Sequence, residues 1–273
     1  MERRELGLTG LQVPVVGMGT WRTFDVYGKD DQAARRELVS AALDASVRFF
    51  DTSPMYGEAE RMLGVSLTSR RNRAIVATKV WSNDVIEGQA QIDRALHYFD
   101  DRVDLYQVHN LVRWRDYLPV FERMKQSGTI RAIGITHYQS TAFPEMARMI
   151  EEETIDTIQV PYNPFEREAE RVLLPLAARR RLGVIVMRPF GEGSLLRRTP
   201  PSRELRAFER FGCTSWSQVL LKWVLSDRRV TVAIPATSSE AHLLENARMG
   251  EPPWFGPDER ARVVRLAEQY CRS

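Results

Sequence analysis

Eight short runs of apolar residues with strand character recur along the chain. They cover residues 15–20, 47–52, 74–79, 103–109, 130–136, 157–162, 183–189 and 231–236. From the second run to the seventh, the starts of successive runs are 25 to 30 residues apart, which is the length of one strand, one helix and two loops. The runs are nearly continuous in Val, Ile and Phe, so we expect strands buried on both faces, as in a parallel sheet covered by helices.

The segments between these runs carry apolar residues at helical spacing. Five of them are 34–46, 88–99, 117–128, 143–153 and 166–181. Glycines such as Gly128 and Gly183 are expected to end helices and lead into the next strand. A strand and a helix repeated eight times predict an α/β fold, a (β/α)8 TIM barrel formed as one domain by residues 1–273, with a doubly wound open sheet as the alternative.

Two further features flank this repeat. Residues 4–13 predict a β-hairpin before the first strand, because GLTG separates two short stretches of strand character. The gap between the last two apolar runs is longer than the others and has room for extra helices at 202–211 and 215–226.

Composition and charge narrow the classes of function. With 273 residues, 43% hydrophobic and 27% charged, the chain is typical of a globular protein, and its net charge of +3 is too small to indicate a nucleic-acid partner. Cys213 and Cys271 are not spaced for a zinc site or a disulfide framework. No apolar run of about 18 residues and no cleavable leader is recognisable, so we expect a cytoplasmic protein that binds no membrane. The sequence does not indicate an oligomeric state.

The predicted strand ends carry ionisable side chains. Asp51 lies at the end of the second run, Lys79 at the end of the third and His109 at the end of the fourth, while Tyr56 follows the second run. Active sites of parallel barrels lie at the carboxyl ends of the strands, so these four side chains are expected to meet at one mouth. The chain has only four lysines, including Lys79, but thirty-five arginines. This bias favours a role for Lys79 as an amine whose pKa can be adjusted, which arginine cannot provide. Each residue alone is more typical of a cap, a rim aromatic or a structural histidine.

Together the four side chains indicate proton transfer. Asp51 is expected to pair with Lys79, because an unpaired charge is costly to bury. The ammonium is expected to lower the pKa of Tyr56 from about 10 toward working pH, while a neutral His109 orients a substrate oxygen. Such a set of side chains can protonate a substrate oxygen while another group attacks the carbon bonded to it. A metal site needs more ligands than His137 can add, so none is predicted.

These residues lie in stretches that resemble the aldo-keto reductase family along nearly the whole chain. The stretches are GMGTW (17–21), FFDTSPMYG (49–57), VATKV (76–80), LYQVHN (105–110), GITHY (134–138), QVPYNP (159–164), MRPFGEG (187–193) and IPATSSEAHLLEN (234–246). The resemblance implies that Tyr56 is the general acid, Lys79 adjusts its acidity, Asp51 pairs with Lys79 and His109 orients the carbonyl. It also implies NAD(P)H-dependent reduction of an aldehyde or ketone to an alcohol, with hydride from a nicotinamide and a proton from Tyr56.

The resemblance further implies cofactor contacts across the barrel mouth. The nicotinamide carboxamide would meet Thr136, His137 and Gln159, with Met187 under the ring. The other implied contacts are Gly19, Thr20, Trp21, Asp51, Arg188, Pro189, Phe190, Gly191, Pro235, Ala236, Thr237, Ser238, His242, Glu245 and Asn246. Of these, 188–191 would approach the pyrophosphate, and Glu245 and Asn246 the adenine.

Three departures from the family pattern bear on the cofactor. Thr136 and His137 stand where serine and asparagine are usual, and Met187 stands where an aromatic ring commonly stacks. Ala236 and His242 stand where a lysine and an arginine usually hold the 2′-phosphate of NADPH. Three hydroxyls that can still bind a phosphate are those of Thr237, Ser238 and Ser239. NADPH is therefore favoured, with NADH as the alternative.

Loop residues around the mouth are expected to bind the substrate. The candidates are Trp21, Tyr27, Tyr56, Trp81, His109 and Asn110, with Leu111 and Trp114 beside them. An apolar, aromatic mouth fits a carbonyl compound with a hydrophobic part, or a sugar stacked on a ring. Two other functions stay open, an NAD-dependent sugar or alcohol dehydrogenase of the same fold and a cofactor-bound redox-sensing accessory subunit. The complete set of four ionisable residues argues against the accessory subunit.

Overall fold

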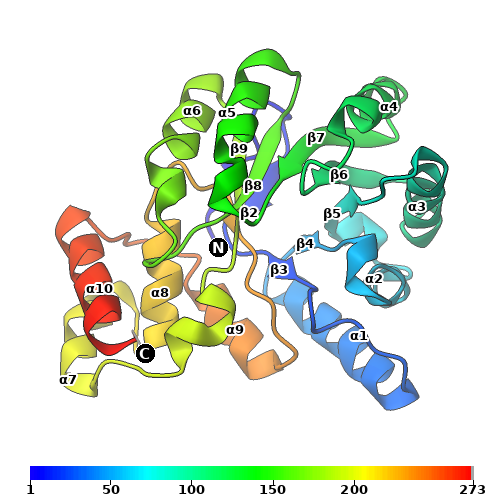
Figure 1. Ribbon diagram of the computed structural model, residues 1–273. Coiled ribbons are helices and arrows are strands. Elements are labelled where there is room, and N and C mark those ends of the chain that lie inside the picture. Colours follow the sequence, from blue (N-terminus) through cyan, green and yellow to red (C-terminus); the bar gives the residue numbers. More distant parts are fainter. Residues whose placement is uncertain (272–273) are drawn as a thin grey trace.

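The computed structural model describes residues 1–271, and eight parallel strands form its centre (Figure 1). The strands follow one another around the sheet in chain order: β3 (Met18–Gly19), β4 (Phe49–Asp51), β5 (Ile75–Val80), β6 (Val103–His109), β7 (Ile130–Thr136), β8 (Thr157–Pro161), β9 (Gly183–Met187) and β10 (Val232–Ala233). Parallel bridges from Val16 to Ala233 and from Gly19 to Ala236 bring the last strand to the first. This nearly closed ring confirms the (β/α)8 barrel and excludes the open doubly wound sheet.

Helices surround the strands, and most lie where the apolar spacing predicts them (Figure 1). The predicted ones are α1 (Lys29–Asp44), α3 (Val85–Tyr98), α4 (Trp114–Gln126), α5 (Phe143–Glu152), α6 (Leu173–Arg180), α7 (Ser202–Leu205) with the 3-10 segment η6 (Arg206–Phe211), and α8 (Trp216–Leu225). The helix predicted over 166–181 is shorter than expected, because only its second half is α-helical. Among residues 1–271, no helix is long and apolar enough to cross a membrane.

Three helices were not predicted. They are α2 (Ala59–Leu67), α9 (Glu240–Arg248) and α10 (Pro257–Tyr270), of which α10 lies at the outer edge beside α7 and α8 in Figure 1. Short 3-10 turns complete the chain: η1 (Pro54–Tyr56), η2 (Arg71–Arg73), η3 (Ser140–Ala142), η4 (Glu168–Glu170) and η5 (Gly191–Leu196).

The predicted N-terminal hairpin closes one end of the barrel. β1 (Arg3–Glu5) pairs antiparallel with β2 (Gln12–Pro14). Leu6, Leu11 and Val13 of this hairpin belong to the same buried cluster as the apolar side chains that line the barrel. The hairpin packs against the start of β9, so it covers the amino ends of the strands and leaves the carboxyl ends for a site.

The turn between α6 and β9 differs from the expectation that Gly183 ends the helix. The helix ends at Arg180, and Arg181 takes the left-handed conformation with a φ of 57°. Gly183 is the first residue of β9, where a Cβ would lie 2.7 Å from Leu6 Cδ1. A side chain here would have to displace Leu6, because the hairpin lies directly on the strand. At Gly128, which follows α4 with a φ of 80°, the expectation is confirmed.

One carboxyl group is buried in the wall of the barrel, behind the strand that carries Lys79. Glu60 on α2 accepts a hydrogen bond from Thr78 Oγ1 of β5. Burial raises the pKa of Glu60 from 4.5 to about 7, against the hydrogen bond from Thr78 and the positive charges of Lys79 and Arg94. Between these two values the folded chain therefore holds a proton that the unfolded chain has released.

This difference predicts that the contribution of Glu60 to folding stability falls as the pH rises from 4.5 to about 7, by up to about 3 kcal/mol. Glu60→Gln keeps an acceptor for Thr78 but cannot ionise. Urea unfolding of both proteins across this range should show the variant gaining stability relative to the wild type with rising pH. Parallel stability curves would contradict the buried, protonated carboxyl.

Candidate active site

Neighbouring strands bring the predicted residues to one end of the barrel. Asp51 is the last residue of β4, His109 of β6 and Thr136 of β7, and Lys79 is the next-to-last residue of β5. In the sheet register, His109 lies opposite Thr136, which lies opposite Gln159 of β8. Because the carboxyl ends of parallel strands share one rim, these side chains converge as the spacing predicts.

A buried ion pair lies at the centre of this rim. Lys79 Nζ is 2.7 Å from Asp51 Oδ1 and donates a second hydrogen bond, also of 2.7 Å, to the carbonyl oxygen of Thr52. The side-chain amides of Gln107 and Gln159 each donate to Asp51 over 3.2 Å. Asp51 is 2% exposed and Lys79 1%. Burial of such a pair is tolerated only when further hydrogen bonds satisfy both partners, as they do here.

Tyr56 lies over the ammonium of this pair. Lys79 Nζ is 5.1 Å from the centroid of the tyrosine ring. Burial lowers the pKa of Lys79, but Asp51 and Tyr56 offset it and raise the pKa overall, so the ammonium stays charged. The predicted lowering of the Tyr56 pKa is wrong for this structure: burial raises it, and the opposing effect of Lys79 is smaller. Tyr56 therefore keeps its proton at neutral pH.

His109 is a neutral imidazole beside Tyr56. The two rings meet edge to face, with centroids 5.8 Å apart and an interplanar angle of 89°. Burial, together with the positive charges of Lys79 and His137, lowers the pKa of His109 to about 2. The ring is therefore uncharged at neutral pH, as predicted.

The sequence prediction lacks three residues that support this site. Gln107 and Thr52 bind the ion pair, and Ser53 Oγ lies 2.9 Å from His109 Nδ1. The sequence could have identified Gln107, because it precedes His109 by two positions and alternate residues of a strand face the same side. The contacts of Thr52 and Ser53 depend on the path of the turn after β4, which no spacing rule reveals.

The residues implied for the nicotinamide also lie at this rim. Thr136 Oγ1 and Gln159 Oε1 are buried and have no hydrogen-bond partner within residues 1–271. Met187 packs against the apolar cluster inside the barrel. His137 is partly exposed, and its Nδ1 accepts a 3.0 Å hydrogen bond from the N–H of Gln139. Thr52 Oγ1 and Gln107 Oε1 are also buried without a partner in the described chain.

Arg188 lies at the mouth between two carboxylates. Its Nε is 2.8 Å from Glu192 and its Nη1 is 3.6 Å from Glu166. Asn163 donates a 2.9 Å hydrogen bond to the carbonyl oxygen of Arg188, whose φ of 55° is unusual for a residue other than glycine. The guanidinium is close enough to Tyr56 for its charge to act on the pKa of the phenol.

The other residues implied for the cofactor differ in exposure. Gly19, Thr20, Pro189, Pro235, Thr237 and Asn246 are buried, Phe190, Gly191 and Glu245 are partly buried, and Trp21, Ala236, Ser238 and His242 are exposed. Ser239 caps α9 by accepting from the N–H of His242, and Thr237 Oγ1 accepts from the N–H of Ser239 over 3.0 Å. Glu245 Oε1 accepts hydrogen bonds from Ser215 and Ser217 at the start of α8.

Aromatic side chains project from two loops around the mouth, the one between β3 and α1 and the one after β5. Trp21, Tyr27 and Trp81 are 36%, 71% and 41% exposed, and Asn110 is partly exposed. Trp114 does not lie beside them as expected. Trp114 is buried in the core as the first residue of α4, and Leu111 packs against that core.

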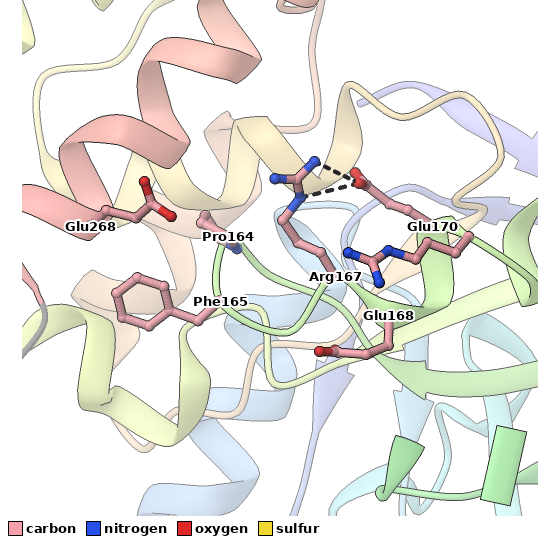
Figure 2. A pocket seen from close by; sticks show the side chains of 7 residues that line it. Pro164, Phe165, Arg167, Glu168, Glu170 and Glu268 are labelled. Atoms are coloured by element: carbon pink, nitrogen blue, oxygen red, sulfur yellow. Dashed lines mark hydrogen bonds and ion pairs between the residues drawn. The ribbon is translucent and has the colours of Figure 1, made fainter. Parts of the chain in front are cut away.

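A surface hollow of about 410 Å³ lies apart from these residues (Figure 2). It is lined by Pro164, Phe165, Arg167, Glu168, Glu170, Arg171 and Glu268. Figure 2 shows the ion pair between Arg167 and Glu170 in its wall. None of the four predicted catalytic residues lines this hollow. Within the described part of the chain, no group of three or more His, Cys, Asp and Glu side chains is placed to hold a metal ion.

A parallel barrel that holds a charged lysine, a protonated tyrosine and a neutral histidine at its open end defines an enzyme that can deliver a proton to a bound molecule. The family model described as "Aldo/keto reductase family" matches residues 15–267. The chain belongs to the aldo-keto reductase family. This membership confirms the prediction of an NAD(P)H-dependent oxidoreductase that reduces carbonyl groups.

Individual relatives agree with this assignment. Aldo-keto reductase YhdN of Bacillus subtilis (strain 168) is 32% identical over 199 residues, which are 65% of this chain and 58% of that protein. Methylglyoxal reductase YeaE of Escherichia coli (strain K12) is 26% identical over 92% of this chain and 90% of that protein. An aldo-keto reductase of Klebsiella pneumoniae in complex with NADPH has a TM-score of 0.83 at 23% identity, over 98% of this chain and 96% of that chain, and shows the common fold.

Removing one partner of the central ion pair is expected to destabilise the fold. Lys79→Met leaves the Asp51 carboxylate buried without its cation and should lower the free energy of unfolding by about 3–5 kcal/mol. Asp51→Asn combined with Lys79→Met removes both charges and should recover most of that loss, without restoring activity. Urea unfolding measures both effects. Equal stabilities of the single and double variants would contradict a buried, coupled pair.

Proposed function

We propose that residues 1–273 act as one domain that reduces an aldehyde or ketone to an alcohol with NADPH, and that Tyr56 donates the proton. The observation that carries this proposal is the buried pair of Lys79 and Asp51 beside a protonated Tyr56. The neutral imidazole of His109 next to the phenol adds a group that can orient a carbonyl. The cytoplasmic location stays a prediction from the sequence.

Each of the four side chains has a separate role in the proposed reduction. A bound nicotinamide supplies a hydride to the carbonyl carbon. Tyr56 gives its proton to the carbonyl oxygen, so the C=O bond becomes an alcohol. As the phenol loses its proton, the fixed ammonium of Lys79 stabilises the phenolate, and Asp51 keeps that ammonium in place. His109 donates a hydrogen bond to the carbonyl oxygen and does not compete for the proton, because its pKa is far below neutrality.

The chemistry of the rim fits a nicotinamide. Thr136 Oγ1 and Gln159 Oε1, which have no partners in the described chain, can bind the amide of its carboxamide. The thioether of Met187 offers an apolar, polarisable surface under the ring. Arg188 can exchange its pairing with Glu192 for the pyrophosphate, since a guanidinium binds either anion through two hydrogen bonds.

The preference for NADPH rests on hydroxyl groups and a helix end. The α9 segment begins at Glu240 with Ser239 as its cap, and the N–H groups of such an end favour a phosphate. Ser238 is exposed beside this end. Ala236 and His242 stand where the family usually has a lysine and an arginine. The enzyme is therefore expected to prefer NADPH over NADH only modestly.

The substrate proposal is a small aldehyde or ketone with an apolar part. Trp21, Tyr27 and Trp81 give the mouth a partly exposed aromatic surface. The relative from Escherichia coli is named a methylglyoxal reductase, which supports a small carbonyl compound as the first substrate to assay.

Tyr56→Phe tests the proton donor. Loss of the phenolic proton should lower kcat for carbonyl reduction by about 10²–10⁴-fold, because general acid catalysis is removed. Cofactor affinity, measured by fluorescence quenching, should stay close to that of the wild type. Tyr98→Phe on α3, away from the site, is the matched control and should leave both quantities unchanged. Full turnover in Tyr56→Phe would refute the assignment.

His242→Arg tests the phosphate end. A guanidinium at the start of α9 should form a charge-assisted hydrogen bond with the 2′-phosphate and raise the ratio of kcat/KM for NADPH over NADH by about tenfold or more. His242→Gln, which adds no charge, should leave this ratio near the wild-type value. If arginine and glutamine give the same ratio, the phosphate is bound elsewhere.

A further inference from the structure

Ser53 contacts both the turn of the proposed acid and the imidazole. It is fully buried between β4 and η1. Its Oγ accepts a 3.2 Å hydrogen bond from the N–H of Met55 and lies 2.9 Å from Nδ1 of His109. Its carbonyl oxygen accepts the N–H of Tyr56 over 3.0 Å. Ser53 therefore contacts His109 through its side chain and Tyr56 through its main chain.

The hydrogen-bonding capacity of Ser53 decides which nitrogen of His109 carries the proton. A hydroxyl has one proton to donate and two lone pairs that accept. The N–H of Met55 can only donate, so it occupies one lone pair. If Nδ1 also donated to Oγ, the buried hydroxyl proton would lack a partner among the described residues, which is unfavourable. All three groups are satisfied when Ser53 donates to an unprotonated Nδ1 and the ring proton lies on Nε2.

We propose that Ser53 is a positioning residue that fixes His109 as the Nε2–H tautomer. This inference rests on the proposed function, in which His109 donates a hydrogen bond to the substrate carbonyl. With its proton on Nε2 the ring presents a donor to the carbonyl oxygen, whereas the other tautomer presents a lone pair that repels it. The charged and titratable groups that act on the ring are Lys79, His137 and Tyr56; the ammonium of Lys79, and His137 when it is protonated, oppose protonation of the ring. The ring is neutral, so the tautomer alone determines what it offers.

Nuclear magnetic resonance of protein labelled with ¹⁵N in histidine reads the tautomer directly, without substrate or cofactor. The chain has four histidines, which keeps the spectrum simple. His137 is an internal reference, because its Nδ1 accepts from the N–H of Gln139 and its ring proton therefore lies on Nε2 when neutral. His109 should show the same Nε2–H pattern at neutral pH. An Nδ1–H pattern for His109 in the wild type would overturn the proposal, whatever any variant does.

Two substitutions connect the tautomer to catalysis. Ser53→Ala removes the donor, so it should populate both tautomers of His109 and lower kcat about tenfold while KM for the cofactor is unchanged. Ser53→Thr keeps a hydroxyl and should restore the pattern and kcat. If Ser53 served only as the cap of η1, Ser53→Ala would lower stability and leave the tautomer and kcat unchanged, and that result would overturn the proposal.

A matched variant separates this inference from the proposed function. Tyr56→Phe should abolish proton transfer and leave the spectrum of His109 as in the wild type. Full activity in Tyr56→Phe would therefore refute Tyr56 as the proton donor and would leave the assigned tautomer of His109 unaffected. An Nδ1–H pattern for His109 in the wild type would refute the role of Ser53 and would leave the assignment of Tyr56 as the proton donor unaffected.

Discussion

The candidate active site depends on one interaction, the buried ion pair between Asp51 and Lys79. Two charges with almost no exposure are tolerable only if every remaining lone pair and proton is satisfied. Here the partners come from different strands, since the amides of Gln107 and Gln159 reach Asp51 and the carbonyl oxygen of Thr52 reaches Lys79. The barrel brings β4, β5, β6 and β8 to one rim and so supplies these partners, which means that the pair depends on the fold.

The pair explains how a tyrosine can act as the acid in this site. Burial keeps the phenol protonated, and in the proposed reaction the nearby ammonium would stabilise the charge that forms as the proton leaves. Because the two effects act at different stages, Tyr56 need not be ionised at rest. His109 lies beside the phenol as a neutral imidazole and is the proposed hydrogen-bond donor, and Ser53 contacts both residues at the turn after β4. The interior below is apolar and closed by the hairpin, which leaves this polar rim as the open end of the barrel.

Much of this architecture could be predicted because parallel strands buried on both faces leave continuous apolar runs. Asp51, Lys79 and His109 could be placed together because each run ends at the same rim. Helices without a strong apolar stripe could not be predicted in this way. One example is α10, which buries only Val263, Leu266 and Ala267 within a highly charged stretch. The direction of the Tyr56 pKa also escaped prediction, because the sequence names the neighbouring charge but does not reveal how deeply the phenol is buried.

The most direct test is a crystal structure of this chain with NADP⁺ and a carbonyl compound bound. We expect the carbonyl oxygen to lie within about 2.6–3.2 Å of both Tyr56 Oη and His109 Nε2, with the nicotinamide beside the carbonyl carbon and its carboxamide on Thr136 and Gln159. A carbonyl oxygen that faces away from Tyr56, or a dinucleotide bound elsewhere than across this rim, would contradict this expectation.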